Sequence, residues 1–598
     1  MRQDMNVLER ETQGKNAVAF GSDAIADLLR ELGHKYIALT PGASFRGLHD
    51  SLVNYLGNKD PELLLCIHEE NAVSLAHGWT RVTGKPMVVA LHSNVGLMHA
   101  TMSIFNAWCD RVPMVIIGAQ GPMDSTRRRP WVDWIHTTTD LGALLRGYTK
   151  WDNQPASVPS ALEAILRAHQ IAATEPAGPT FVCLDAGLQE GVLDPSSPTL
   201  PPLDRFSRPQ PAEPPVAALK EAAQLLSKAK RPLIMFGRMS GEQSDWDARV
   251  ALAERLGATV LTDIKTRATF PTAHPLQPFP PTLYLTPEAG DLIADADVIL
   301  ALDWIDPAGT MRQACRGEVP SGKVILCSLD QYSHNGWSMD HQALPVTDLN
   351  VLASPDRFVV RLLEELSAGE PGAHVPHRRA EPEPGPDMVE GRISVAALAR
   401  TVTDELSAHN PSYMRLPLGW PGASCHFEGP LDYIGFDGGG GIGSGPGMAT
   451  GAAMALRDMG SGRLPVAVLG DGDYLMGLTA LWTAVHYKVP MLILVANNRS
   501  FFNDELHQER VARMRGRPIE NRSIGLRMEN PSLDLATLAT GQGAVGIGPV
   551  CTPEELASEI ARAVDLVKAG GVVVIDVSVA PEYSRATSNA MLREGKSN

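Results

Sequence analysis

The sequence predicts an α/β protein made of three doubly wound parallel-sheet domains. Short apolar runs alternate with segments of helical periodicity along the 598 residues, and this alternation is typical of parallel sheets covered by helices on both faces. Two proline-rich stretches divide the chain into pieces of ordinary domain size. We predict domains at 1–195, 216–367 and 389–598, joined by extended linkers at 196–215 and 368–388.

Short apolar runs mark the expected strands, and segments with a helical pattern separate them. The first and third domains share a rhythm of strand, glycine-containing turn and covered helix, which suggests a duplicated fold. The expected strands are 36–40, 63–67, 87–91, 113–119, 179–185, 231–237, 258–263, 297–303, 323–330, 464–470, 491–497 and 571–577.

Composition argues against several classes of protein. The formal net charge of −16 disfavours a nucleic-acid surface, which needs clustered Lys and Arg side chains. No apolar run approaches the ~18 residues of a membrane-spanning helix, and the polar amino terminus lacks the apolar core of a signal peptide. The seven cysteines are scattered without CxxC pairs, as is usual for reduced thiols. We expect a soluble, cytoplasmic protein that binds neither nucleic acid nor membranes.

One stretch of the third predicted domain carries a chemical signal. Residues 464–470 and 491–497 are expected to form buried parallel strands, with an amphipathic helix at 478–487 between them. Asp471 follows the first strand and Asn498 follows the second. Because ligands bind at the carboxyl ends of parallel strands, we expect these two side chains to lie side by side. Their oxygens suit Mg²⁺ or Ca²⁺ holding a phosphate.

The paired signals 470–472 (GDG) and 497–498 (NN) resemble the diphosphate-binding motif of the thiamine diphosphate enzymes. The resemblance implies that Asp471, Asn498 and the backbone carbonyl of Ser500 bind Mg²⁺, which holds the diphosphate of the cofactor. A glycine turn and an asparagine turn in an ordinary α/β domain are the alternative. The spacing of the two motifs and the strands before them disfavour it.

The segment 66–86 resembles the part of this family that supplies a carboxylate to the pyrimidine ring of thiamine. The resemblance implies Glu69 as the catalytic carboxylate, with its neighbour Glu70 as the less favoured choice. A lone glutamate at a helix start usually serves only the helix dipole, so this assignment depends on the motif in the third domain. A zinc motif of the HExxH type is rejected because Ala72 stands where the second histidine would be.

The glycine-rich stretch 438–456 supplies a third element of the resemblance. It implies that Ile442 supports the bent conformation of the cofactor and that the carbonyl of Gly440 accepts from the pyrimidine amine. A dinucleotide-binding GxGxxG pattern and a close-packing helix turn are the alternatives for the same glycines. The cofactor-binding residues implied are Gly440, Ile442, Gly470, Asp471, Gly472, Asp473, Asn498 and Ser500.

The resemblance covers nearly the whole chain and implies pyrimidine-binding, central and diphosphate-binding domains. Within the family, 91–114 and 270–275 are most similar to benzoylformate decarboxylase and, one step further, to acetolactate synthase-like enzymes. His92 and His274 then correspond to the proton-transferring histidines, a role that suits imidazole near neutral pH. A loop histidine without a catalytic role is an equal alternative for His274.

The function implied is thiamine diphosphate- and Mg²⁺-dependent cleavage of a C–C bond, as in non-oxidative decarboxylation of a 2-oxo acid. The alternatives are carboligation to a second carbonyl compound, as in acetolactate synthase, and a non-catalytic subunit with this fold. The family also implies a homodimer or homotetramer with active sites at subunit interfaces. No fingerprint demands a flavin or coenzyme A site.

Several departures leave the substrate open. Ala43 occupies the position of a serine in the decarboxylase, and Ser44 comes next. The charged stretch 499–523 differs from both relatives and is expected to cover the site as a lid. The segment 125–140, with Trp131, Trp134 and His136 in it, is a candidate wall of the substrate entrance.

Overall fold

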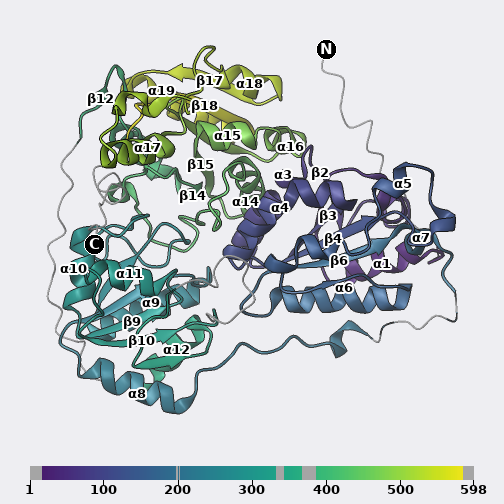
Figure 1. The fold of residues 1–598 in the computed structure, drawn as a ribbon, viewed down its shortest axis with the longest axis horizontal. Coiled ribbons are helices and arrows are strands. Elements are labelled where there is room, and N and C mark those ends of the chain that lie inside the picture. The colour runs from purple at the N-terminus through teal and green to yellow at the C-terminus, as the bar shows by residue number, and fades with distance from the viewer. Residues whose placement is uncertain are drawn as a thin grey trace. The chain divides into compact units, whose positions relative to one another are not determined.

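The computed structural model describes residues 17–194, 196, 200, 202–330, 343–366 and 385–583. The chain forms two compact units, Met1–Gln210 (unit 1) and Pro211–Asn598 (unit 2). Three parallel sheets with helices on their faces carry the fold (Figure 1), and they confirm the α/β prediction. The exact domain limits stay predictions. Most of the predicted linker 368–388 lies outside the described residues.

Unit 1 contains a parallel sheet with the strand order β2-β1-β3-β4-β6-β5. Helices α1, α2 and α6 pack on one face, and α3 and α4 pack on the other (Figure 1). The elements are α1 Gly21–Glu31, β1 Tyr36–Leu39, α2 Arg46–Asp50, β2 Glu62–Leu65, α3 Glu69–Thr83, β3 Met87–His92, α4 Ser93–Cys109, β4 Met114–Gln120, α5 Val132–Ile135, β5 Asp152–Asn153, α6 Val158–Ala173, β6 Pro179–Asp185 and α7 Ala186–Glu190.

The first sheet of unit 2 has the order β11-β10-β9-β7-β8, a doubly wound arrangement. One core lies under α8, α9 and α12, and a second core lies under α10 and α11. The elements are α8 Val216–Ser227, β7 Pro232–Phe236, α9 Gln243–Leu256, β8 Thr259–Thr262, α10 Pro287–Asp295, β9 Val298–Leu302, α11 Pro307–Ala314, β10 Lys323–Cys327, β11 Leu349–Val351 and α12 Pro355–Glu365.

The second sheet of unit 2 has the order β14-β15-β16-β18-β17. The run β1-β3-β4-β6-β5 in unit 1 follows the same order, which supports the predicted duplication. The elements are β12 Met388–Val389, β13 Arg392–Ile393, α13 Val395–Leu406, β14 Pro411–Arg415, α14 Gly445–Asp458, β15 Leu464–Gly470, α15 Asp471–Met476, α16 Ala480–His486, β16 Met491–Asn497, α17 Phe502–Met514, α18 Leu535–Gly541, β17 Val545–Val550, α19 Pro553–Lys568 and β18 Val572–Ser578.

Every run predicted as a strand overlaps a strand of the structure. Six short or irregular strands were not predicted. These are β5, β11, β12, β13, β14 and β17. The helix predicted at 478–487 corresponds to α16, but the prediction missed a second short helix, α15. Both helices lie between β15 and β16, and α15 begins directly at Asp471. Asp471 and Asp473 lie in the first turn of α15, where negative charge is favourable.

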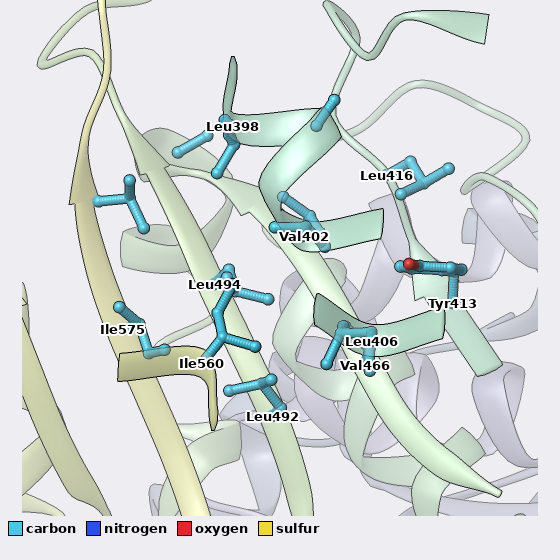
Figure 2. Packing of buried hydrophobic residues seen from close by; sticks show 14 of the residues in the cluster. Leu398, Val402, Leu406, Tyr413, Leu416, Val466, Leu492, Leu494, Ile560 and Ile575 are labelled. Atoms are coloured by element: carbon cyan, nitrogen blue, oxygen red, sulfur yellow. The ribbon is translucent and has the colours of Figure 1, made fainter. Parts of the chain in front are cut away.

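The core of the second sheet of unit 2 explains why β15, β16 and β18 are continuous apolar runs. Figure 2 shows side chains of α13, such as Val402, pointing toward Leu494 and Ile575 of the sheet. Strands covered on both faces bury every side chain and so lose the alternating pattern of half-buried strands. This packing holds the carboxyl ends of the strands, where the candidate site lies.

Tyr433 joins the two sheets of unit 2. Its ring is fully buried and stacks on Phe427, with ring centroids 5.3 Å apart. The Tyr433 hydroxyl donates to the Ile264 carbonyl (2.8 Å), and the Tyr433 carbonyl accepts from the Ala268 amide (2.9 Å). These contacts explain why two predicted domains form one compact unit.

No helix among the described residues has the length and apolar character to cross a membrane.

We predict that Tyr433→Phe lowers the free energy of unfolding of unit 2 by about 1–2 kcal/mol, because the buried Ile264 carbonyl loses its hydroxyl donor. The ring and its stacking stay in place. Urea denaturation monitored by near-ultraviolet circular dichroism measures the change. An unchanged midpoint would contradict the proposed role of this bond in coupling the sheets.

Candidate functional site

A cavity of about 300 Å³ opens at the carboxyl ends of β15 and β16 in unit 2. The two strands pair in parallel, with Gly470 opposite Ala496, so the turns that follow them are neighbours. All the residues predicted to bind the cofactor line this cavity: Gly440, Ile442, Gly470, Asp471, Gly472, Asp473, Asn498 and Ser500.

Asp471 is buried at the floor of this cavity, with 4 % of its surface exposed. Its carboxylate accepts from the amides of Gly472 (2.8 Å) and Arg499 (2.6 Å), which come from two different turns. Burial nevertheless raises the pKa of Asp471 to about 6, because desolvation outweighs the hydrogen bonds from the backbone amides. The site therefore holds a desolvated carboxylate that a cation would stabilise.

Asn498 and Ser500 complete an oxygen-rich corner of the cavity. The side-chain oxygen of Asn498 accepts from the Ser500 amide (2.8 Å), which fixes the turn after β16. The Ser500 hydroxyl donates to Glu505. The predicted cation ligand of this residue is its backbone carbonyl oxygen. A carboxylate, an amide oxygen and a backbone carbonyl are the ligands that a hard divalent cation prefers. The donor set fits such an ion.

The carboxylate of Asp473 binds groups of the protein. One oxygen accepts from the amides of Gly443 (2.7 Å) and Gly445 (3.1 Å). The other oxygen pairs with the Arg415 guanidinium at 3.0 Å. Asp473 thus lines the cavity as predicted, yet its carboxylate clamps the glycine-rich turn. A direct contact between this carboxylate and the cofactor stays a prediction.

The glycine-rich turn needs glycine for its backbone conformation. Gly438, Gly440 and Gly443 have φ angles of 58°, 71° and 105°, which side chains rarely tolerate. Ile442 lies within this turn and lines the cavity beside Leu416 and other apolar side chains. The cavity therefore combines apolar walls with an oxygen-rich corner, as a ligand with rings and phosphates requires.

Arg415 is a residue of this site that the sequence analysis missed. Its side chain is 3 % exposed, lines the cavity and lies over the Phe436 ring at 4.3 Å. Asp437 (2.8 Å) and Asp473 (3.0 Å) both pair with it and raise its pKa against the effect of burial. A single arginine after an irregular strand gives no sequence signal of such a role.

The charged stretch 499–523, predicted to be a lid, forms α17 and the 3₁₀ segment Ile519–Ser523. The part of it that lines the cavity is 500–504, which comprises Ser500, Phe501, Phe502, Asn503 and Asp504.

Buried ion pairs fix this segment. Glu505 is fully buried and accepts from the Ser500 hydroxyl (2.6 Å) and from Arg527 (2.8 Å). Arg527, Arg522 and the hydrogen bond from Ser500 hold the pKa of Glu505 low despite its burial. The segment is thus a charged, hydrogen-bonded wall of the site.

In unit 1, Glu69 is the first residue of α3 and is 7 % exposed. Its Oε2 lies 3.0 Å from Nδ1 of His99 on α4. His68, the residue before α3, stacks on the His99 ring with centroids 5.2 Å apart. The ligand atoms of the three residues all lie within 4.8 Å of one another, and Glu69 and His99 share a hydrogen bond. The observed geometry is that of a hydrogen-bonded cluster.

His92 is the last residue of β3, at the point where the strand order of the sheet reverses. The Ser44 hydroxyl lies 2.8 Å from His92 Nδ1, and the His136 ring packs edge-on at 4.8 Å. Burial and then His136 lower the pKa of His92, although Glu69 acts in the opposite direction. Ligands of doubly wound sheets bind at such reversal points.

The loop after β1 is shaped around His92. A Cβ at Gly42 would lie 2.2 Å from the His92 ring, so only glycine fits there. The side chain of Gln189, fully buried, donates to the Ser44 carbonyl at 2.9 Å and fixes this loop. Ser44 thus places its hydroxyl against His92, although Ala43 occupies the position where the sequence comparison expects serine.

The remaining residues that the sequence singled out are Trp131, Trp134, His136 and His274. Trp131 and Trp134 are 71 % and 70 % exposed, while their neighbour His136 packs against His92. His274 lies in unit 2 and is not among the residues that line the described cavities. Its Nδ1 accepts from the Leu276 amide (3.2 Å), and its Nε2 lies 3.3 Å from Glu254. This geometry is that of a turn histidine, so a catalytic role for His274 stays a prediction.

Three family models match the chain. They describe the N-terminal, central and C-terminal domains of thiamine pyrophosphate enzymes and cover residues 20–144, 219–311 and 419–577. The chain therefore belongs to the thiamine pyrophosphate-dependent enzymes. The matched ranges include Glu69, His92 and the cavity residues from Gly440 to Ser500.

Among curated proteins, the chain is similar to benzoylformate decarboxylase of Pseudomonas aeruginosa, with 24 % identity over 74 % of this chain and 80 % of that protein. It is 24 % identical to the large subunit of acetolactate synthase isozyme 3 of Escherichia coli, over 94 % of both chains. A protein of P. aeruginosa described as a probable 2-ketoarginine decarboxylase is 27 % identical over 87 % of this chain and 88 % of that protein.

The solved structures show the same fold. Benzoylformate decarboxylase from Polynucleobacter necessarius superposes with a TM-score of 0.77 at 20 % identity, covering 94 % of this chain and 99 % of the other. The thiamine diphosphate-dependent 4-hydroxybenzoylformate decarboxylase of Rhodococcus jostii RHA1 gives a TM-score of 0.73, with the same identity and coverage.

We predict that Asp473→Ala loosens the glycine-rich turn, because the amides of Gly443 and Gly445 lose their buried acceptor. Hydrogen–deuterium exchange of peptides that cover 438–447 should accelerate about tenfold or more, which corresponds to the loss of one or two hydrogen bonds. Asp458→Ala, on the same unit, serves as a control. Unchanged exchange at 438–447 would show that other contacts hold the turn.

Proposed function

We propose that this protein is a thiamine diphosphate- and Mg²⁺-dependent lyase that decarboxylates a 2-oxo acid. One observation carries the choice of reaction: His92 at the reversal point of the unit 1 sheet, hydrogen-bonded to Ser44. The similarity to two decarboxylases of 2-oxo acids supports it. The charges of the C-terminal cavity support the choice of cofactor.

The C-terminal cavity contains the groups that would hold the cofactor. Asp471, Asn498 and the Ser500 carbonyl would bind Mg²⁺, and Mg²⁺ with the amides of the turn would hold the diphosphate. Ile442 and the Gly440 carbonyl would contact the rings. When bound, thiamine diphosphate would supply a carbon nucleophile that adds to a carbonyl group and a cationic ring that accepts the electron pair released when the adjacent C–C bond breaks.

Glu69 is the candidate for proton exchange with the pyrimidine nitrogen of the cofactor. Its carboxylate is buried and held on one oxygen by His99, so it is poised in one orientation. We propose that it holds a proton at that nitrogen. In line with the family, we also propose a homodimer or homotetramer with active sites at subunit interfaces.

His92 is suited to deliver a proton to the product carbon. Its lowered pKa keeps the imidazole neutral near pH 7. If the Ser44 hydroxyl donates to Nδ1, the proton of the ring lies on Nε2, which is the donor atom for the substrate side. After taking up a second proton from solvent, the ring can give one proton to carbon as the imidazolium and return to its neutral form in each turnover.

Carboligation is the second candidate, because acetolactate synthases are similar to this chain over nearly its whole length. It would use the same cofactor-binding residues and would join the substrate fragment to a second carbonyl compound. A second cavity, of about 260 Å³, lies beside the first sheet of unit 2 and is lined by Trp304, Lys265 and Asp263 among others. Its lining does not favour either reaction.

We predict that the holoenzyme converts one or more members of a 2-oxo acid panel to aldehyde and carbon dioxide, which mass spectrometry and a carbon dioxide assay detect. His92→Ala should slow aldehyde release by about 10²-fold or more, the usual contribution of a general acid. Ligation to an added aldehyde should slow less. A hydroxyketone formed without free aldehyde would favour carboligation, and equal loss of both activities would exclude the proposed role of His92.

We predict that Mg²⁺-dependent cofactor binding weakens about tenfold per pH unit below about pH 6, because the cation must displace the proton of Asp471. The raised pKa has the opposite effect on the metal-free fold. Native Asp471 binds its proton more tightly than the unfolded chain does, so the metal-free protein gains stability as pH falls from about 6 toward 4.

Isothermal titration with Mg²⁺ and thiamine diphosphate between pH 5 and 8 measures the first effect. Asp471→Asn should abolish the pH dependence together with most of the affinity. Cofactor binding that persists after thorough chelation would contradict the metal assignment.

A further inference from the structure

The carboxylate of Glu69 lies in a gap formed by two residues of α4. His99 contacts Oε2 at 3.0 Å. Gly96, one helical turn earlier, lies beside the other oxygen, since a Cβ at this position would lie 3.5 Å from Oε1 and 3.2 Å from the Leu91 carbonyl carbon. Helix α4 therefore holds one oxygen of the carboxylate and presents only a glycine beside the second.

His68 fixes the ring of His99. The two imidazoles stack with centroids 5.2 Å apart and planes inclined by 18°. His68 Nδ1 accepts from the Glu70 amide at 3.3 Å, so the proton of this ring lies on Nε2. Burial lowers the pKa of His68, which keeps it neutral beside His99. The stack thus orients the His99 ring without placing a positive charge next to it.

Exposure changes sharply across the hydrogen bond between Glu69 and His99. The side chain of Glu69 is 9 % exposed, whereas that of His99 is 53 % exposed. With Nδ1 donating to the carboxylate, the second nitrogen of the His99 ring remains for water. An imidazole can accept a proton at one nitrogen and release one from the other, so His99 connects a buried acid with solvent.

We infer that His99 is a positioning residue for Glu69: it orients the buried carboxylate and exchanges protons between this carboxylate and solvent. This inference rests on the proposed role of Glu69 toward the cofactor. Glu69 begins α3, whereas His99 lies in the middle of α4. The packing of these two helices brings the residues together, so the contact depends on both positions.

The charged and titratable groups around the pair come from three elements. His68 precedes α3 and is neutral, and Glu69 itself supplies the negative charge. Burial and then His136 lower the pKa of His92, at the end of β3. Glu69 lies close enough to act in the opposite direction, but its effect is smaller. His99 is therefore the solvent-exposed member of a small network of histidines around one carboxylate.

The first test uses the cofactor-free protein with ¹⁵N-labelled histidine. The ¹⁵N shifts of His99, assigned with His99→Gln, should show a protonated, hydrogen-bonded Nδ1 at pH 8.5. Glu69→Ala should move the proton to Nε2, the form that free histidine favours. Identical shifts in the wild type and Glu69→Ala would overturn the inference, because the pair would not exist in solution.

The second test follows the exchange of the thiazolium proton of bound thiamine diphosphate with deuterium, by quenched-flow mass spectrometry. His99→Gln should keep cofactor affinity within twofold and slow the exchange about tenfold, whereas Glu69→Gln should slow it by about 10²-fold or more. His49→Gln, at an exposed histidine of α2, is the matched control and should exchange like the wild type.

The outcomes separate the two proposals. Wild-type exchange in His99→Gln, together with slow exchange in Glu69→Gln, would overturn the role of His99 and leave the proposed function intact. A wild-type protein that does not bind thiamine diphosphate would overturn the proposed function, whereas the ¹⁵N shifts would still decide whether His99 holds Glu69. Loss of cofactor binding in His99→Gln would contradict a role limited to Glu69.

Discussion

The buried carboxylate of Asp471 is the constraint on which the C-terminal site depends. A carboxylate removed from water is costly unless hydrogen bonds and a cation compensate it. Two backbone amides, from Gly472 and Arg499, supply the hydrogen bonds. They follow different strands, so both reach the carboxylate only when β15 and β16 pair in register. The raised pKa of Asp471 shows that these bonds alone do not offset its burial, which leaves a site suited to a divalent cation.

A second set of buried charges shapes another part of the cavity wall. Arg415 lies between Asp437 and Asp473, and two carboxylates face one guanidinium. The amides of Gly443 and Gly445 and the Ser444 hydroxyl offset the excess negative charge. The position of Ile442 therefore depends on electrostatics as well as on the conformational freedom of glycine. Breaking one such pair leaves the remaining buried charge uncompensated, so the members of this set depend on one another.

Much of this protein could be predicted from its sequence because its signals are local. Buried strands are apolar runs, and the GDG and NN motifs lie directly after two of them, so Asp471 and Asn498 were found correctly as neighbours. Contacts between distant segments could not be predicted. The Arg415–Asp473 pair, the Ser44–His92 bond and the Glu69–His99 bond depend on register and helix packing. His274 stays undecided, since a motif alone does not distinguish a turn histidine from a proton donor.

The two units carry different kinds of chemistry, and this division bears on the choice of reaction. In unit 2 the cavity groups hold charge in fixed positions, which every reaction of a diphosphate cofactor requires. In unit 1 the groups near the strand ends are acid–base side chains, above all the Glu69 carboxylate and the His92 imidazole, whose pKa burial lowers. The imidazolium form of histidine is a far stronger acid toward a carbon atom than a serine hydroxyl is. The orientation of His92 by Ser44 therefore supports the proposed decarboxylation, in which an aldehyde is released after protonation, whereas joining to a second carbonyl compound needs no proton at that carbon.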